Sequence, residues 1–134
     1  MDFEAKIAEL GLLIPKPAKP AGSYKPCVIV DNIAYISGQG PLLEDGSFAK
    51  GKVGADVDLE TAQNHARLCG LAILSALKNE IGSINKVDQL IKLTGFVNCI
   101  ESFTQQPLVI NGCSNMMKDI FGETGVHALS LIHI

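Results

Sequence analysis

A long amphipathic helix is the feature that most limits how this 134-residue chain can fold. Asp58 can cap a helix over Leu59–Ile81, and Gly82 stands where a helix commonly ends in a left-handed conformation. Small and aliphatic side chains recur along it at steps of three or four residues and make one continuous stripe (Ala62, Ala66, Cys69, Ile73, Leu77 and Ile81). Because many of these side chains are small, the helix axis can lie close to a sheet.

Two short apolar runs before this helix predict a β-hairpin. The runs are Cys27–Val30 and Ile33–Ser37, and the Asp31-Asn32 pair between them tolerates the positive φ angles of a two-residue turn. The chain ahead of the hairpin predicts a short helix within Met1–Gly11 and then an extended arm over Pro15–Pro26. Four prolines in this arm exclude a helix there.

One strand and one helix are expected after the long helix. Val87–Asn98 reads as a strand, with Gly95 indicating a bulge or a close backbone approach. A second helix follows Thr104, with Pro107 in its first turn, and Gly122 ends it. Its expected buried face consists of apolar side chains (Leu108, Cys113, Met116, Met117, Ile120 and Phe121). This order of elements predicts an α+β fold with helices on one side of a mixed sheet.

Composition narrows the class of protein. With 47% hydrophobic and 19% charged residues the chain can bury one core, and the formal charge of −3 argues against a nucleic-acid surface. No run approaches the ~20 apolar residues that span a bilayer, and Met1–Leu10 is too acidic for a secretory signal. Four cysteines without a CxxC pair predict reduced core thiols and no zinc site. We therefore expect a cytoplasmic location without membrane or nucleic-acid partners.

The chain lacks the residues that complete the familiar nucleotide-binding and metal-binding motifs. Gly38-Gln39-Gly40 follows a strand, but Leu43 stands where a dinucleotide-binding loop needs its third glycine. His65 is the lone histidine of its helix, and no carboxylate or second histidine four residues away supports a metal site. No pair of acids lies in an apolar setting, so spacing alone predicts no catalytic residue, metal or cofactor.

Uncharged groups at the ends of elements carry a family resemblance. Gly22-Ser23-Tyr24, Ser37-Gly38-Gln39-Gly40-Pro41 and Val109-Ile110-Asn111 resemble, in order and spacing, the turn, hairpin end and second helix of the RidA/YjgF family. The resemblance implies a chorismate-mutase-like α+β fold, in which two helices pack on one face of a mixed sheet. The short N-terminal helix and proline-rich arm resemble a subgroup with an N-terminal extension. We assign residues 1–128 to a single domain of this kind.

The resemblance also implies a function. Better-known members are homotrimers with clefts between subunits, and they hydrolyse reactive 2-imino and 2-enamino acids to 2-oxo acids and ammonia without metal or cofactor. By match, Tyr24, Ser37, Gly38 and Asn111 would line the cleft as substrate-binding residues. An arginine clamps the substrate carboxylate in such members, and a glutamate near the C-terminus positions water. The alternative is a non-catalytic, stress-associated module that binds small carboxylates or a protein. Ribonuclease activity fits less well, because the chain lacks a basic face.

The family pattern breaks after Ala128. Where the family continues with an arginine and two further strands, this chain has Leu129–Ile134. The hexapeptide matches the translation of a common sequencing-library adapter, so we expect the domain to be incomplete, with its last strands missing and residues 129–134 read through from an adapter. The chain as it stands would then be inactive. A genuine divergent C-terminus is the alternative. An arginine at position 129 would favour the enzyme, and any other residue the binding module.

Overall fold

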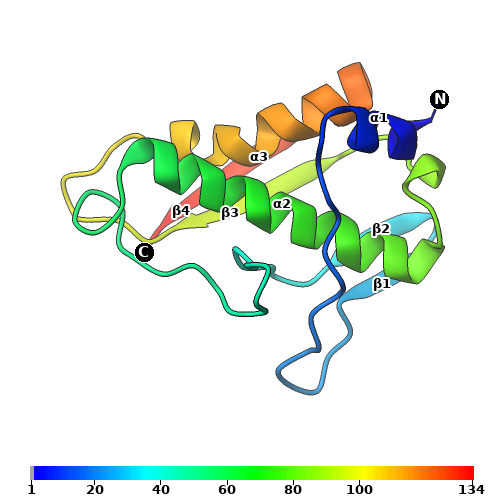
Figure 1. The fold of residues 1–134 in the computed structure, drawn as a ribbon, viewed down its shortest axis with the longest axis horizontal. Coiled ribbons are helices and arrows are strands. Elements are labelled where there is room, and N and C mark those ends of the chain that lie inside the picture. The colour runs from blue at the N-terminus through cyan, green and yellow to red at the C-terminus, as the bar shows by residue number, and fades with distance from the viewer. Residues whose placement is uncertain (1) are drawn as a thin grey trace.

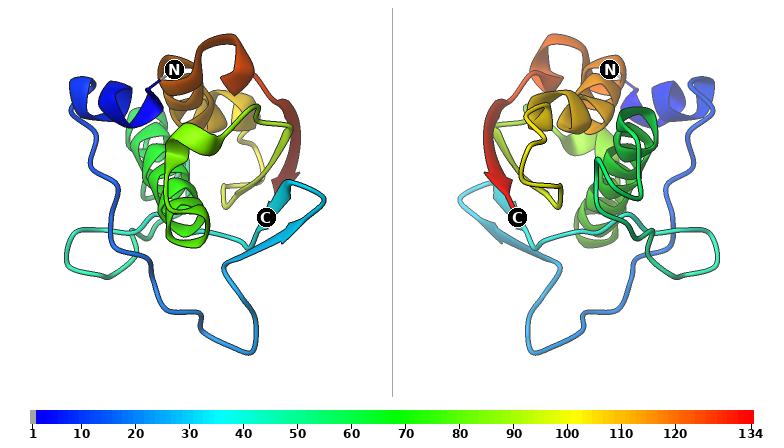
Figure 2. Two further views of the ribbon diagram at one scale, coloured as in Figure 1. Left: turned by 90° about the vertical axis from the view of Figure 1, so that its right-hand side faces the viewer. Right: turned by 90° about the vertical axis from the view of Figure 1, so that its left-hand side faces the viewer.

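Helices and strands form two layers in the computed structural model, which describes residues 2–134. The helices lie on one side of the molecule and the strands on the other (Figures 1 and 2). The helices are α1 (Phe3–Glu9), α2 (Leu59–Ile81) and α3 (Gln106–Phe121), and the strands are β1 (Cys27–Val30), β2 (Ile33–Ile36), β3 (Lys92–Val97) and β4 (Ala128–His133). Two short 3₁₀ turns, Ile84–Lys86 and Gly122–Gly125, follow α2 and α3. The α+β class is confirmed. Met1, where the expected N-terminal helix begins, lies outside the described residues.

Local signals set the bounds of α2 where the sequence predicts them. The Asp58 carboxylate accepts a hydrogen bond from the Thr61 amide at 2.8 Å, and Gly82 ends the helix with a φ of 89°. Hydrogen bonds from the Thr61 side chain and amide hold the pKa of Asp58 below its usual range, because they favour the charged carboxylate. Buried residues continue along most of the helix (Ala62, Ala66, Gly70, Leu71, Ala72, Leu74, Ser75, Ala76 and Leu77).

Helix α3 crosses α2 at very short range. A Cβ atom built on Gly112 would lie 1.9 Å from the carbonyl oxygen of Gln63 on α2, so only glycine fits at this point. The Gln63 side chain also donates a hydrogen bond to the carbonyl of Leu108 at 2.8 Å. Leu108 itself is exposed, and Val109 is buried where Leu108 was expected. The crossing rotates the buried face of α3 by about one residue at its start.

The strands form two separate two-stranded sheets instead of one mixed sheet. β1 and β2 pair antiparallel through a turn in which Asp31 and Asn32 have φ angles of 52° and 62°. β3 and β4 pair in parallel, from Lys92 beside Ala128 to Val97 beside His133. No Cα atom of β2 comes within 8 Å of a Cα atom of β3, whereas paired strands lie about 4.8 Å apart. Both kinds of pairing are present, but the two sheets do not join.

The strand expected over Val87–Asn98 is shorter than predicted. It begins at Lys92, because the preceding residues find only isolated backbone partners, such as the Thr124 carbonyl for the Leu90 amide. The register with β4 runs unbroken through Gly95, so no bulge forms there. Gly95 instead allows close approach, since a Cβ atom on it would lie 2.7 Å from the Ile110 side chain on α3.

The N-terminal segment is fastened to α2 at both ends. Glu4 on α1 bonds to Lys78, and the Ser83 hydroxyl donates to the other Glu4 carboxylate oxygen at 2.6 Å. Beyond α1 the proline-rich arm passes across α2 toward the hairpin (Figure 1). The buried Ser75 hydroxyl of α2 donates to the Pro15 carbonyl at 2.6 Å and holds the start of this arm.

Candidate functional site

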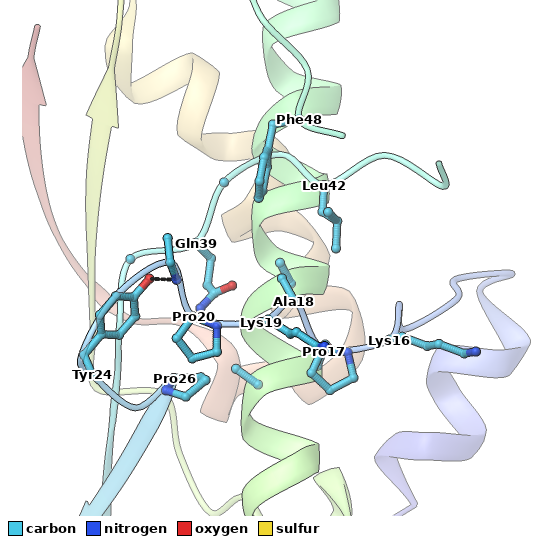
Figure 3. Close-up of a pocket in the computed structure, with 16 residues that line it drawn as sticks. Lys16, Pro17, Ala18, Lys19, Pro20, Tyr24, Pro26, Gln39, Leu42 and Phe48 are labelled. Atoms are coloured by element: carbon cyan, nitrogen blue, oxygen red, sulfur yellow. Dashed lines mark hydrogen bonds between the residues drawn. The ribbon is translucent and has the colours of Figure 1, made fainter. Parts of the chain in front are cut away.

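A small cavity forms where the proline-rich arm passes over α2. Its volume is about 130 Å³, and it lies between the arm, the segment after β2 and the helix (Figure 3). The arm contributes Lys16, Lys19 and Tyr24, and the segment after β2 contributes Gly38 and Gln39. Apolar side chains, among them Leu42, Phe48, Ala72 and Ala76, close the remaining walls. The cavity therefore combines positive charge with a phenol and an amide, a set that suits a small anion.

Tyr24 and Gly38 present polar groups to this cavity. The Ala21 amide donates to the Tyr24 hydroxyl oxygen at 3.3 Å, which leaves the phenolic hydrogen free to donate to a ligand (Figure 3). A Cβ atom on Gly38 would meet no atom within 4 Å, so the space beside this backbone is open to a ligand. The structure thus brings together two of the four residues that the sequence singles out, on one cavity.

Ser37 faces a second, larger space. Its hydroxyl donates to the Lys25 carbonyl at 2.6 Å, and its amide donates to the Pro26 carbonyl at 2.9 Å, so it fastens the end of β2 to the arm. The side chain borders a groove of about 750 Å³ between β2 and β3, beneath α2 and α3. Gly38 borders both spaces. The groove walls are mainly apolar and include Ala34, Ile36, Cys69, Ile73, Val97 and Ile110, with His65 at its edge.

Asn111 lies apart from the other three residues. It is half-buried on α3 and lines neither the small cavity nor the groove. Ser114, one helical turn further along the same face, bonds to His127 with 2.9 Å between Oγ and Nε2. The His127 Nδ1 atom lies 2.9 Å from the Ala128 carbonyl oxygen. Sequence reasoning missed this pair, because the two residues lie 13 positions apart and on either side of the end of the helix.

The cysteines are mostly buried thiols. All four are free, and Cys27, Cys99 and Cys113 are buried as the sequence predicts. Burial raises the pKa of Cys69 to about 11 and that of Cys113 to about 12, so both thiols are protonated at neutral pH. Within residues 2–134 there is no group of three His, Cys, Asp or Glu side chains that could hold a metal ion. None of the described helices is long and apolar enough to cross a membrane.

Comparisons with known proteins agree with this architecture. Residues 4–133 match the family model described as "YjgF/chorismate_mutase-like, putative endoribonuclease". The chain is 35% identical over 125 residues to Protein TCP17 of Trypanosoma cruzi, an alignment that covers 92% of this chain and 78% of that protein.

Solved structures match along the whole chain. Atu1372 of Agrobacterium tumefaciens, a protein of unknown function, has a TM-score of 0.87 and 40% identity, over 98% of this chain and 80% of its own. A "putative endoribonuclease" from Shewanella oneidensis has a TM-score of 0.95 and 30% identity, over 100% of this chain and 89% of its own.

The matched region corrects one expectation from the sequence. The family match continues past Ala128 to residue 133 and includes most of the hexapeptide Leu129–Ile134. Residues up to His133 lie in β4, where Leu129 pairs with Leu93 and Leu131 with Gly95, and aliphatic side chains suit a strand. The comparisons therefore do not support a break in the family pattern at Ala128. In sequence and in fold, the chain belongs to the YjgF/chorismate-mutase-like family.

Proposed function

We propose that this domain binds small 2-imino and 2-enamino acids and promotes their hydrolysis to 2-oxo acids and ammonia. The observation that carries the proposal is the small cavity, where Tyr24, Gly38 and two lysines of the arm line one space. Family membership supports the same substrate class, through the resemblance of these motifs to imine-hydrolysing relatives. A substrate of this class has a carboxylate for Lys19 and an imine nitrogen for a hydroxyl donor.

Each residue has a proposed role that its geometry allows. The Tyr24 hydroxyl donates to the substrate carboxylate or imine, since its oxygen already accepts from Ala21. The open side of Gly38 lets the substrate lie against the main chain. Lys19 supplies the positive charge, whereas the Lys16 side chain extends away from Tyr24 (Figure 3). Ser37 fixes the end of β2 through Lys25. Asn111 would enter such a site only from another subunit.

The outer face of the strands supports a homo-oligomer. Register places alternate side chains of the four strands on the face turned away from the helices, and six of them are exposed and apolar (Val28, Val30, Ile33, Tyr35, Phe96 and Ile132). An exposed apolar face of this kind marks a contact surface. It supports the proposal of a homotrimer with clefts between subunits. The four reduced thiols also fit the proposed cytoplasmic location.

Leu129 favours a second candidate, a non-catalytic module that binds small carboxylates. A leucine cannot form the bidentate pair that an arginine makes with a carboxylate. Arg67, an exposed residue of α2, is the chain's one arginine, so the described cavity has lysines alone as cations. Lysine is a point charge that orients a carboxylate less strictly. We therefore expect slow hydrolysis by this chain, and a gain when an arginine replaces Leu129.

An imine-hydrolysis assay separates the candidates. An amino-acid oxidase generates the imine in situ, and formation of the 2-oxo acid is compared with the spontaneous rate. The enzyme hypothesis expects acceleration that falls roughly tenfold in Tyr24→Phe, the equivalent of one lost hydrogen bond. Tyr35→Phe, on the outer strand face, is the matched control and should leave the rate unchanged. Leu129 lines neither the cavity nor the groove, so Leu129→Arg should raise the rate only where β4 enters a cleft between subunits.

Other outcomes are equally informative. If the spontaneous rate is unchanged but calorimetry detects pyruvate binding that Tyr24→Phe weakens, the binding module is correct. If neither protein changes the rate or binds pyruvate, the small cavity is not the site and the proposal fails. Cleavage of RNA that survives Tyr24→Phe would instead favour the activity named for the Shewanella oneidensis protein.

A further inference from the structure

The hydrogen bond between Ser114 and His127 has a defined donor, which the neighbouring Ala128 carbonyl determines. The Ala128 carbonyl can only accept a hydrogen bond, so its 2.9 Å contact requires that His127 Nδ1 carries a hydrogen. In the neutral imidazole the Nε2 atom then has the lone pair. The Ser114 hydroxyl, 2.9 Å from Nε2, therefore donates its hydrogen to His127. The backbone selects the tautomer in which the ring can act as a base toward the serine.

We infer that Ser114 and His127 form a nucleophile–base pair that accepts an acyl group from an activated ester. A hydroxyl bonded to an imidazole whose other nitrogen is held by an acceptor is the arrangement that activates serine in acyl transfer. Here a backbone carbonyl holds the ring where a carboxylate does so elsewhere. This inference does not depend on the small cavity, and it is independent of the imine chemistry proposed above.

Both members of the pair are partly accessible at the surface. Ser114 and His127 are half-buried, so neither is enclosed in the core. Asn111 precedes Ser114 by three residues and shares its helix face, also half-buried. An asparagine amide beside the nucleophile can donate to the oxygen that becomes negative during acyl transfer. Asn111, which lies apart from Tyr24, thereby gains a role in a separate site on α3.

The reaction balances without a cofactor. The Ser114 oxygen attacks the ester carbonyl as its hydrogen passes to His127 Nε2, and a tetrahedral oxyanion forms. The bond to the leaving alcohol then breaks, and the alcohol takes the hydrogen from His127. The product is an ester of Ser114. Water, deprotonated by His127, releases the acid and restores the serine hydroxyl.

Covalent labelling with a fluorophosphonate tests the pair directly. Such a probe phosphonylates serines activated by a base and loses fluoride, so intact-mass and peptide mass spectrometry should show one adduct, on Ser114. His127→Gln should slow labelling at least about hundredfold, because general base catalysis contributes about that much. Ser102→Ala and His65→Gln are matched controls outside the pair and should label as the unmodified chain does. Release of p-nitrophenol from p-nitrophenyl acetate should follow the same order.

Folding is checked separately, since His127 also joins β4 to α3. Each variant is compared by its thermal unfolding midpoint. A Ser114→Cys variant provides a second readout: its alkylation by iodoacetamide at about pH 7 should be at least about tenfold faster than that of the Ser114→Cys, His127→Gln double variant. Absence of a Ser114 adduct in the folded chain would overturn the inference. So would labelling and alkylation rates that are unaffected when His127 is replaced.

Discussion

The helical layer and the strand layer of this domain differ in how much of their apolar surface is buried within one chain. Helices α2 and α3 meet at backbone distance, with Gly112 of one against Gln63 of the other, and most of their inward side chains are buried. The strands form two separate pairs, and large apolar side chains stay exposed on their outer face. Tyr35 is 59% exposed and Phe96 is 60% exposed.

This difference indicates which contacts each layer requires. The helical layer completes its packing within one chain, because the crossing is fixed by glycine and by side chains that reach the facing backbone. The strand layer leaves a groove on one side and an apolar face on the other. Since water contact with apolar surface is unfavourable, this layer is the one that the proposed homotrimer would stabilise by association.

The largest expected effect comes from adding a methyl group at Gly112, where the two helices touch. In an isolated helix Gly112→Ala would stabilise by about 1 kcal/mol, because alanine has the higher helix propensity. Here the new methyl would overlap the Gln63 carbonyl, so we expect destabilisation by about 3 kcal/mol and a thermal midpoint lower by roughly 10 °C. The sign of the change is therefore diagnostic. Calorimetry checks it, with Gly38→Ala as the control.

Gly38 suits this purpose, because an added Cβ there meets no neighbour within 4 Å. A midpoint that shifts equally in Gly38→Ala and Gly112→Ala would mean that backbone freedom, and not the crossing, determines the stability of α3. A raised midpoint in Gly112→Ala would show that the helices separate readily, and the contrast between the two layers would be lost.

A charge on the outer strand face should have the next largest effect. Tyr35→Lys places an ammonium among exposed apolar side chains, where a like partner surface would have to desolvate it. We expect self-association to weaken at least about tenfold, with the unfolding midpoint of the dissociated chain nearly unchanged. Sedimentation velocity across a concentration series measures this. Asn79→Lys adds the same charge to the exposed side of α2 and should leave the assembly intact.

Association that is insensitive to Tyr35→Lys would place the subunit contact elsewhere. A monomer at all concentrations would mean that the exposed face has no copy of the chain as its partner. Either result would remove the support that this face gives to a homotrimer.

The same contrast explains what the sequence predicts and what it misses. The bounds of α2 and the Asp31-Asn32 turn depend on neighbouring residues, so the cap, the terminal glycine and the positive φ angles are all readable in advance. The start of β3 depends on β4, which lies far along the chain, as the register of Lys92 with Ala128 shows. Strand pairing over such separations has no local signal, so the sequence predicts this start too early.

The site residues also fall into those that the sequence identifies and those that only the structure reveals. Tyr24 and Gly38 lie on segments that the hairpin brings together, and motif resemblance finds them. The position of Asn111 depends on how α3 is rotated against α2, which the glycine contact sets. Ser114 and His127 meet because the chain turns back after Gly122, and the sequence gives neither residue a catalytic role. Residues that meet through such tertiary contacts are visible only in the structure.

The smallest expected effect concerns the attachment of α1 to the helical layer and depends on pH. The bond from Lys78, followed by that from Ser83, holds the pKa of Glu4 below its usual value of 4.5. A group whose pKa is lower in the folded state stabilises that state above its unfolded pKa, and this stabilisation is lost as pH falls through the folded value. The pair is partly exposed, so the contribution is below about 1 kcal/mol. Glu4→Gln should lower the unfolding midpoint slightly at about pH 7 and not at about pH 3.

Glu9→Gln is the matched control, because the Glu9 carboxylate lies 3.7 Å from Lys6 on the exposed side of α1. If both variants respond alike at both values of pH, α1 is held by Phe3 and Ile7 in the core and not by Glu4.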